Sequence, residues 1–239
     1  MKEGIYGGHD ETGIQYDNAS VKIYGGKVGV DIDHLANIHG GGYGNNTFTR
    51  GSVDVTIGKQ NATDGATIFG DVYGGSAMGK VNGESNRTND AVTNVTLNAG
   101  TINGNLYGGG LGTPGTDGYA ADVYGPVQVT VNGGKVNNVF GCNNTKGAPK
   151  STVNVQMNAG EVHECVYGGG NAAAYTGDPE VTVEGGEVHQ HVFGGGLGSG
   201  AIITGNTRVT IQGTAHIHGN VYGGGNGGLV TGNTHVDIK

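Results

Sequence analysis

This sequence is poor in several residue types at once: it has no tryptophan, four prolines and two cysteines, and charged residues make up only 13% of it. Two cysteines are too few for a disulfide scaffold. The 12 lysines and arginines are scattered, whereas a nucleic-acid backbone needs clustered cations, so we expect no nucleic-acid partner. No apolar run approaches the roughly 20 residues of a membrane-spanning helix, and we expect no membrane insertion.

Glycine, by contrast, occupies 53 of the 239 positions. Collagen would place glycine at every third residue, and this chain does not. Disorder is excluded because short runs, such as residues 53–57 and 127–131, alternate apolar and polar side chains as half-buried strands do. Long helical periodicity is absent. Composition and patterning together predict a folded, turn-rich, all-β chain.

One motif recurs along the whole chain: an apolar residue, then an aromatic residue or histidine, then glycine. Its ring-bearing positions are spaced 26 to 34 residues apart: Tyr6, His39, Tyr73, Tyr107, Phe140, Tyr167, Phe193 and Tyr222. Before the motif lie a strand with alternating apolar residues, such as Val95 and Leu97, and a corner of small residues, such as Ala99 and Gly100. A loop of variable length follows it. Each repeat therefore holds three short strands joined by glycine corners.

Such repeats predict a single-stranded, right-handed parallel β-helix (a solenoid) of about eight coils, forming one domain over residues 1–239. One coil cannot bury its inward valine and isoleucine side chains, but coils stacked about 4.8 Å apart cover them and pair their backbones. Right-handed winding is the rule for parallel crossovers. The main alternative is a propeller, for which this spacing leaves too little chain. Because neither end shows a polar cap, we expect the chain to be a fragment of a longer protein.

The loops after the motifs carry aromatic and acidic side chains, whereas the motif rings themselves are expected to stack as a column that stabilises the coils. Loops on one edge of a rigid rod commonly bind ligands. We therefore expect a surface glycan or a protein as the ligand along this edge. The candidate binding residues are Tyr43, Tyr119, Asp122, Tyr124, Tyr175 and Asp178.

Histidines form a second candidate site. Three of them follow the first apolar residue of the second strand in consecutive repeats, so we expect them in one column, with a fourth histidine and Cys165 in the next column. Neighbouring imidazoles and a thiol could share a transition metal. Alternatively, this corner position simply tolerates polar side chains, since Asn103 and Asn137 fill it in earlier repeats. The candidate metal ligands are His163, His189, His191 and His218.

We expect no cofactor, and no catalytic motif is evident. Residues 74–81 nearly match a nucleotide-binding loop, but Val81 stands where a serine or threonine would hold magnesium. Hydrolases and lyases on a β-helix need paired carboxylates, or an acid with lysine or arginine, gathered in one groove. On the first strand of each repeat, the charged residues are expected to be isolated: Asp54, Glu180, Arg208, His235 and Asp237.

The Val-Tyr-Gly-Gly-Gly motifs, Val-x-Val strands and Gly-Gly corners resemble repeat regions of large bacterial surface proteins with right-handed parallel β-helices, of the adhesin or autotransporter-passenger kind. The likeness covers essentially the whole chain and transfers no site residue. It implies export to the cell surface or the extracellular space. We therefore expect a non-enzymatic rod whose loops serve adhesion to glycans or proteins, or assembly, including end-to-end self-association. The alternative is a carbohydrate-active β-helix enzyme, a polysaccharide lyase or glycoside hydrolase, with its site in the loops.

Overall fold

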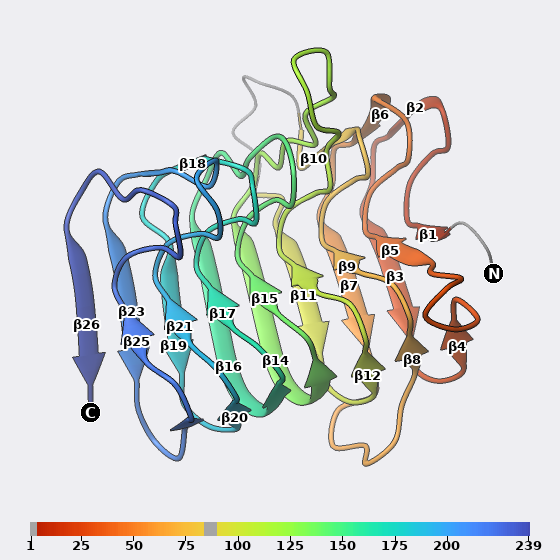
Figure 1. The fold of residues 1–239 in the computed structure, drawn as a ribbon. Coiled ribbons are helices and arrows are strands. Elements are labelled where there is room, and N and C mark those ends of the chain that lie inside the picture. The colour runs from red at the N-terminus through yellow and green to blue at the C-terminus, as the bar shows by residue number, and fades with distance from the viewer. Residues whose placement is uncertain (1–3, 84–89) are drawn as a thin grey trace.

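A computed structural model describes residues 4–83 and 90–239, so residues 1–3 and 84–89 of the expected domain lie outside the described part. Within these ranges every regular element is a β-strand, and no helix is present. The strands lie side by side along one axis, with the amino and carboxyl ends at opposite ends of the stack (Figure 1). Accordingly, no helix that could cross a membrane is found among the described residues.

Two large parallel sheets contain most of the strands. The first, which we call the aromatic sheet, carries the ring motif and joins eight strands within the described ranges: β1 (Gly4–Tyr6), β5 (Asn37–His39), β9 (Val72–Tyr73), β13 (Leu106–Tyr107), β15 (Val139–Phe140), β17 (Val166–Tyr167), β21 (Val192–Phe193) and β25 (Val221–Tyr222). The second, the long sheet, carries the alternating apolar pattern: β3 (Ala19–Ile23), β7 (Val53–Ile57), β11 (Thr93–Leu97), β14 (Val127–Val136), β16 (Val153–Val162), β19 (Glu180–Val183), β23 (Thr207–Ile211) and β26 (Thr234–Ile238). Beyond the corner of each repeat, short strands extend this sheet: β4 (Lys27–Val28), β8 (Thr67–Ile68), β12 (Thr101–Ile102), β20 (Glu187–Val188) and β24 (His216–Ile217).

Shorter ladders join the loops into a surface that we call the loop wall. Its strands within the described ranges form one three-stranded and one two-stranded parallel ladder: β2 (Thr12–Gln15) with β6 (Asn46–Thr49) and β10 (Lys80–Val81), and β18 (Tyr175–Thr176) with β22 (Ile203–Thr204). Single parallel bridges continue the wall by linking Val123 to Val81 and to Pro149. The loops are thus partly ordered by backbone pairing of their own.

The strand register follows the sequence repeat. Val95 pairs with Val55 on one side and with Val129 on the other, so equivalent positions of successive repeats lie beside one another on parallel strands. In the aromatic sheet, Tyr107 pairs in the same way with Tyr73 and Phe140. The chain is therefore all-β, with parallel strands in stacked sheets, as a parallel β-solenoid requires. This part of the expected fold is confirmed.

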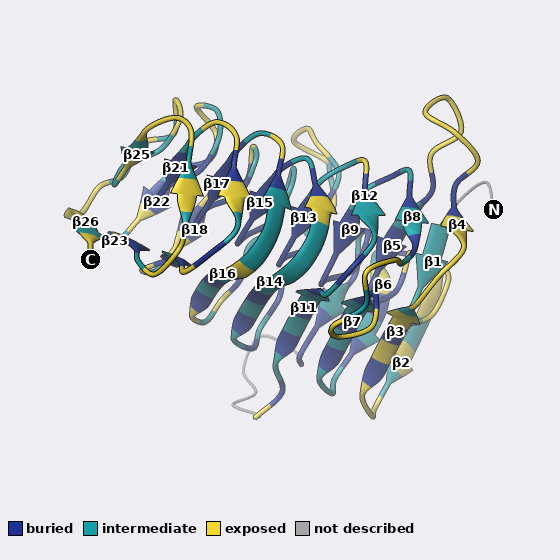
Figure 2. Ribbon diagram, turned by 90° about the horizontal axis from the view of Figure 1, so that it is seen from below, coloured by how far each residue is buried: buried dark blue, intermediate teal, exposed yellow. Residues whose placement is uncertain are grey.

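Inward valine, isoleucine and leucine side chains from both large sheets form one continuous core. Figure 2 shows that buried residues recur along the strands of the stack. In β7 and β11 every second residue is buried, as the alternation predicts. Burying one such side chain contributes about 1.5–3 kcal/mol, so each repeat is stabilised mainly by the repeats beside it. The close approach of neighbouring strands and core side chains also explains why a glycine follows each ring. A Cβ atom at Gly108 would overlap the Gly141 carbonyl oxygen and methyl groups of Val127 and Val129.

Five of the motif rings, with Cys165, form a second buried cluster on the face of the aromatic sheet that points away from the core: Tyr73, Tyr107, Phe140, Tyr167 and Phe193. Successive rings from Tyr6 to Tyr222 stack nearly parallel, with centroids 4.7 to 5.1 Å apart. Leu111 and Leu197 of the loops pack over them. The expected column of stacked rings is confirmed. One of its members is a buried histidine, His39, whose Nδ1 atom has no hydrogen-bond partner.

Candidate functional site

Two of the six candidate binding residues in the loops present partly exposed rings. Tyr43 is 42% exposed and packs edge-on against the Tyr6 ring, with centroids 5.4 Å apart. Tyr119 is 48% exposed and closes a turn in which its amide donates a hydrogen bond to Thr113 Oγ1 at 2.6 Å. Both residues are therefore held in place while part of each ring remains open to solvent.

Tyr175 is placed differently from the sequence expectation. It is 2% exposed, and its hydroxyl donates a hydrogen bond to the Ser151 carbonyl at 2.7 Å. Burial raises the pKa of this hydroxyl. Side chains alternate along β18, so Tyr175 points into the core while Thr176 is exposed. The Tyr175 ring is therefore part of the core, and almost none of it reaches the surface.

Asp122 and Asp178 link neighbouring repeats of the loop wall. Asp122 forms an ion pair with the Lys150 ammonium at 3.0 Å. Asp178 accepts a hydrogen bond from the Asn206 amide at 2.6 Å. Tyr124, in the same extended segment as Asp122, is half-buried. Both carboxylates are held in place by partners within the protein, so a ligand would contact them as fixed groups of an ordered surface.

Two shallow hollows meet at Asp178. One, of about 390 Å³, is lined by residues 150–152 and 175–178. The other, of about 280 Å³, is lined by residues 178–180, 206–208, Asn233 and His235. The structure thus brings Tyr175 and Asp178 to one hollow, and Lys150 connects that hollow to Asp122. Tyr43 and Tyr119 line neither hollow.

The second hollow adjoins a charged cluster that the sequence did not reveal. Arg208 and Asp237 form an ion pair at 2.7 Å, and His235 Nε2 lies 3.0 Å from the Asp237 carboxylate. The expectation that these charges are isolated is therefore wrong. Pairing of β23 with β26 places His235 beside Arg208, with Asp237 two residues further along the same outer face. The hydrogen bond from Arg208 holds the pKa of the Asp237 carboxyl below its usual value.

The three histidines expected in one column do stack beside one another. The His189 ring lies between those of His163 and His218, at centroid distances of 5.7 and 5.0 Å. Two carboxylates that the sequence analysis missed accompany them. His189 Nε2 lies 3.0 Å from the Glu161 carboxylate and 3.8 Å from that of Glu187. The signal was present in the sequence, because each glutamate precedes a histidine by two residues and so shares its outward face.

The fourth candidate metal ligand, His191, lies apart from this column. Its ring packs edge-on against Phe193 and Tyr222, and its Nδ1 accepts a hydrogen bond from the Asn220 amide at 2.9 Å. Stacked imidazoles also hold their nitrogen lone pairs in nearly parallel planes, which do not converge on one tetrahedral ion. Over residues 4–83 and 90–239, no three His, Cys, Asp or Glu side chains are arranged to hold a metal.

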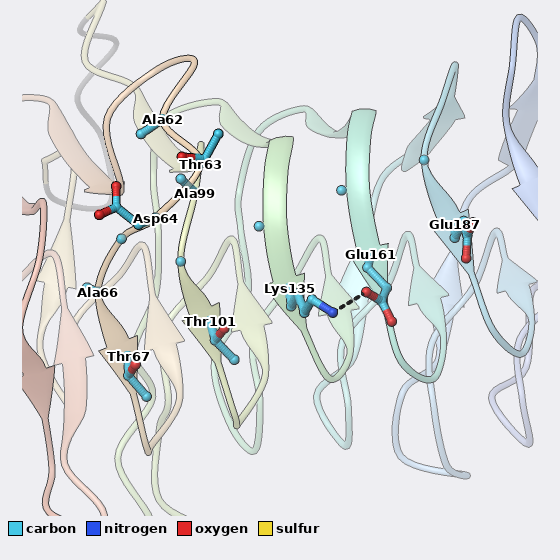
Figure 3. A pocket seen from close by; sticks show the side chains of 15 residues that line it. Ala62, Thr63, Asp64, Ala66, Thr67, Ala99, Thr101, Lys135, Glu161 and Glu187 are labelled. Carbon is cyan, nitrogen blue, oxygen red and sulfur yellow. Dashed lines mark ion pairs between the residues drawn. The ribbon is translucent and has the colours of Figure 1, made fainter.

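A groove of about 620 Å³ follows the corner between the long sheet and its short strands (Figure 3). We call it the corner groove. Glycine and alanine residues of five successive corners lie along it, and residues 62–64 of the β7–β8 loop stand at one end. One side chain per repeat forms its wall, and these side chains occupy paired positions: Thr67, Thr101, Lys135, Glu161 and Glu187.

The charges of the corner groove are mostly acidic. Lys135 pairs with Glu161 at 2.8 Å, and this hydrogen bond holds the pKa of the Glu161 carboxyl below its usual value. Asp64 and Glu187 add two further carboxylates. With one lysine against three carboxylates, the lining has a formal charge of −2 at neutral pH. Its surface therefore suits a cationic or uncharged ligand better than an anionic one.

Comparisons with known proteins return no relationship: no family model, no curated protein and no solved structure matches this chain. Its function is therefore inferred from the geometry above.

Proposed function

We propose that this chain is a segment of a non-enzymatic rod at the bacterial cell surface or outside the cell, which serves adhesion to glycans or proteins. In this proposal the rod is a single-stranded, right-handed β-helix of about eight coils. The sheets of parallel strands support this fold. Its right-handed winding is expected because connections between parallel strands are right-handed in nearly all proteins. The sequence resemblance to adhesin and autotransporter repeats supports the location.

The observation that carries the adhesive role is the backbone pairing of the loops. β2, β6 and β10 form one ladder, and β18 pairs with β22. Loops that are ordered before binding lose less conformational entropy when a ligand arrives. Tyr43 precedes β6, and Tyr119 lies in the loop that Val123 bridges to its neighbours. Both offer partly exposed rings of the kind that pack against sugars and apolar side chains.

A binding survey with matched tyrosine variants tests the adhesive role. The whole chain is applied to a glycan array and to immobilised fibronectin, laminin and collagen. We expect saturable binding to at least one ligand, weakened at least about tenfold when Tyr43 and Tyr119 are both replaced by alanine. Tyr24→Ala is the control, because Tyr24 is 46% exposed and lies directly after the long-sheet strand β3. Absence of binding, or equal binding by the double variant, would contradict the proposal.

A carbohydrate-active enzyme is the second candidate, and the charged cluster at the second hollow favours it. Arg208, His235 and Asp237 gather a guanidinium, an imidazole and a carboxylate on one face, and an acid together with arginine is one of the two arrangements that polysaccharide cleavage uses on this fold. Assays for reducing ends and for unsaturated products on neutral and uronate polysaccharides separate the candidates. Turnover that disappears in Arg208→Ala would establish the enzyme and refute the non-enzymatic rod, whereas no turnover across the panel refutes the enzyme.

Self-association is also part of the proposal. β3 and β26 stand at the two ends of the strand order of the long sheet, so each has one edge without a neighbouring strand from residues 4–83 or 90–239. The β26 edge carries Ile238, which is 67% exposed. A second copy that adds its β3 beside β26 would continue the parallel sheet. Sedimentation velocity should show concentration-dependent dimers that Ile238→Lys reduces, and monomers alone at high concentration would rule this out.

A further inference from the structure

We infer that the corner groove binds an extended, uncharged polysaccharide that lies along the stack of strands. This inference rests on the proposed adhesive function and adds to it a binding site outside the loops and a ligand class. Four observations support it: the shape of the groove, the chemistry of its wall, the hydrogen bonds already made by the backbone along its floor, and the charge of its lining.

Shape favours a polymer over a compact ligand. The groove crosses five successive corners, which at about 4.8 Å per strand makes it several sugar rings long. Its floor is backbone with only the methyl groups of Ala66 and Ala99, because Gly134 and Gly186 adopt φ values of +74° and +85°, which side chains rarely tolerate. Residues 62–64 stand at one end, and Figure 3 shows this loop near Thr67 and Thr101 and away from Glu161 and Glu187. A polysaccharide could thus have one end against this loop and extend along the groove past Glu187.

The chemistry of the wall suits sugar hydroxyls. Thr67 and Thr101 contribute hydroxyl groups, and Glu187 contributes a carboxylate (Figure 3). The wall lysine, Lys135, pairs with Glu161, and the rings next to the Glu187 carboxylate are those of His189 and His218, at 3.8 and 3.7 Å. Each repeat places one such group at the same position, so hydrogen-bonding groups recur at the strand spacing of about 4.8 Å. One sugar ring of an extended, equatorially linked glycan has nearly this length. Successive sugars would therefore meet equivalent wall positions.

A peptide strand fits the groove less well, because the corner backbone is already hydrogen-bonded between repeats. The Thr101 amide donates to the Ala66 carbonyl at 2.8 Å, and the Lys135 amide donates to the Gly100 carbonyl at 2.9 Å. A partner strand needs free backbone groups along an open sheet edge, and these corners do not provide such an edge. The lining side chains also include no large apolar residue to anchor a peptide.

Charge selects among polysaccharides. The lining carries a formal charge of −2, and Lys135 is already paired with Glu161. A uronate or sulfated chain would place its own anions beside Asp64 and Glu187, which like-charge repulsion disfavours. Neutral glycans avoid that repulsion, and their hydroxyls can donate hydrogen bonds to the same carboxylates.

Calorimetric titration with defined oligosaccharides tests the inference on the whole chain. The probes are neutral hexasaccharides of β-1,4-linked glucose, xylose, mannose and N-acetylglucosamine, with hexagalacturonate as the anionic comparator. Thr101→Trp places a bulky ring over the floor. Thr96→Trp is the matched control, because Thr96 is a half-buried, outward threonine of the same repeat on the long sheet. Thermal melting checks that both variants fold.

We expect at least one neutral hexasaccharide to bind, and Thr101→Trp to weaken that binding at least about tenfold while Thr96→Trp leaves it unchanged. Equal weakening by both variants, tighter binding of hexagalacturonate, or no binding of any neutral hexasaccharide would overturn the inference. The outcomes distinguish an error in the groove inference from an error in the proposed adhesive function. Adhesion that survives Thr101→Trp but is lost on replacing Tyr43 and Tyr119 would refute the groove alone, whereas absence of all ligand binding would refute both.

Discussion

Replacing His39 by phenylalanine should stabilise the protein at neutral pH and reduce its sensitivity to acid. His39 is 1% exposed, and its ring stacks between those of Tyr6 and Tyr73 at centroid distances of 5.1 and 4.7 Å. Its Nδ1 atom has no hydrogen-bond partner. Phenylalanine keeps a stacked ring and removes the unsatisfied nitrogen, whose burial costs about 1–3 kcal/mol.

Acid sensitivity follows from the difference in proton binding at His39 between the folded and unfolded chains. Burial lowers the pKa of His39 from an ordinary value of 6.5 to about 3 in the folded chain. Below pH 6.5 the unfolded chain therefore binds a proton that the folded chain excludes, and the free energy of unfolding falls by about 1.4 kcal/mol per pH unit. Lowering the pH from 7.5 to 5.0 should thus remove about 2 kcal/mol, and the loss levels off at about 5 kcal/mol below pH 3.

Urea unfolding at a series of pH values measures this effect. All other histidines are present in both proteins, so the difference between wild type and His39→Phe isolates the contribution of His39. Phe140→His is the matched reverse variant, because Phe140 stacks between Tyr107 and Tyr167 at 4.8 and 4.7 Å. It should destabilise the protein and add the same acid sensitivity. If wild type and His39→Phe lose equal stability between pH 7.5 and 5.0, the reasoning is refuted.

Three other substitutions probe separate features. Gly108→Ala should destabilise by about 3 kcal/mol, because its Cβ overlaps the Gly141 carbonyl oxygen, and an unchanged melting temperature would contradict the close approach of the strands. Tyr175→Phe should cost about 1 kcal/mol in urea unfolding through the lost hydrogen bond to Ser151, and a variant as stable as wild type would show that this bond is not formed. Glu161→Gln should cost less than about 1 kcal/mol, because its lysine partner is exposed, and a cost that persists unchanged in 1 M salt would contradict a screened surface ion pair.

Most of the parallel arrangement could be predicted because inward side chains of one repeat need the next repeat to cover them. Val95 and Val129 occupy the same position of their repeats, and burial places them on neighbouring strands. The ring motif likewise predicted the stack that contains Tyr73 and Tyr107. In both cases the repeat itself specifies the register, since a one-residue slip would turn the apolar side chains outward.

The sites were less predictable because they depend on which face of a short strand a side chain occupies, and on contacts between side chains of different repeats. Tyr175 resembles any loop tyrosine in the sequence, and a two-residue strand is too short for its inward face to be recognised. The ion pair between Arg208 and Asp237 runs diagonally across two strands, so neither neighbours in sequence nor directly paired positions indicate it. The histidine column and the separate position of His191 beside it were both predicted from the repeat, whereas the packing of His191 against the aromatic rings was not.

Pulsed electron spin resonance gives the most direct test of the central claim, that equivalent residues lie one strand apart along a stack of parallel strands. Spin labels are placed at Lys22 together with Thr130, Gln156 or Thr182, with Cys142 and Cys165 replaced by alanine. Register puts these positions three, four and five strands from Lys22. The distances should rise from about 14 to about 19 and about 24 Å, one strand spacing at a time. Distances that fail to increase in this order would contradict the stack and every column of side chains inferred from it.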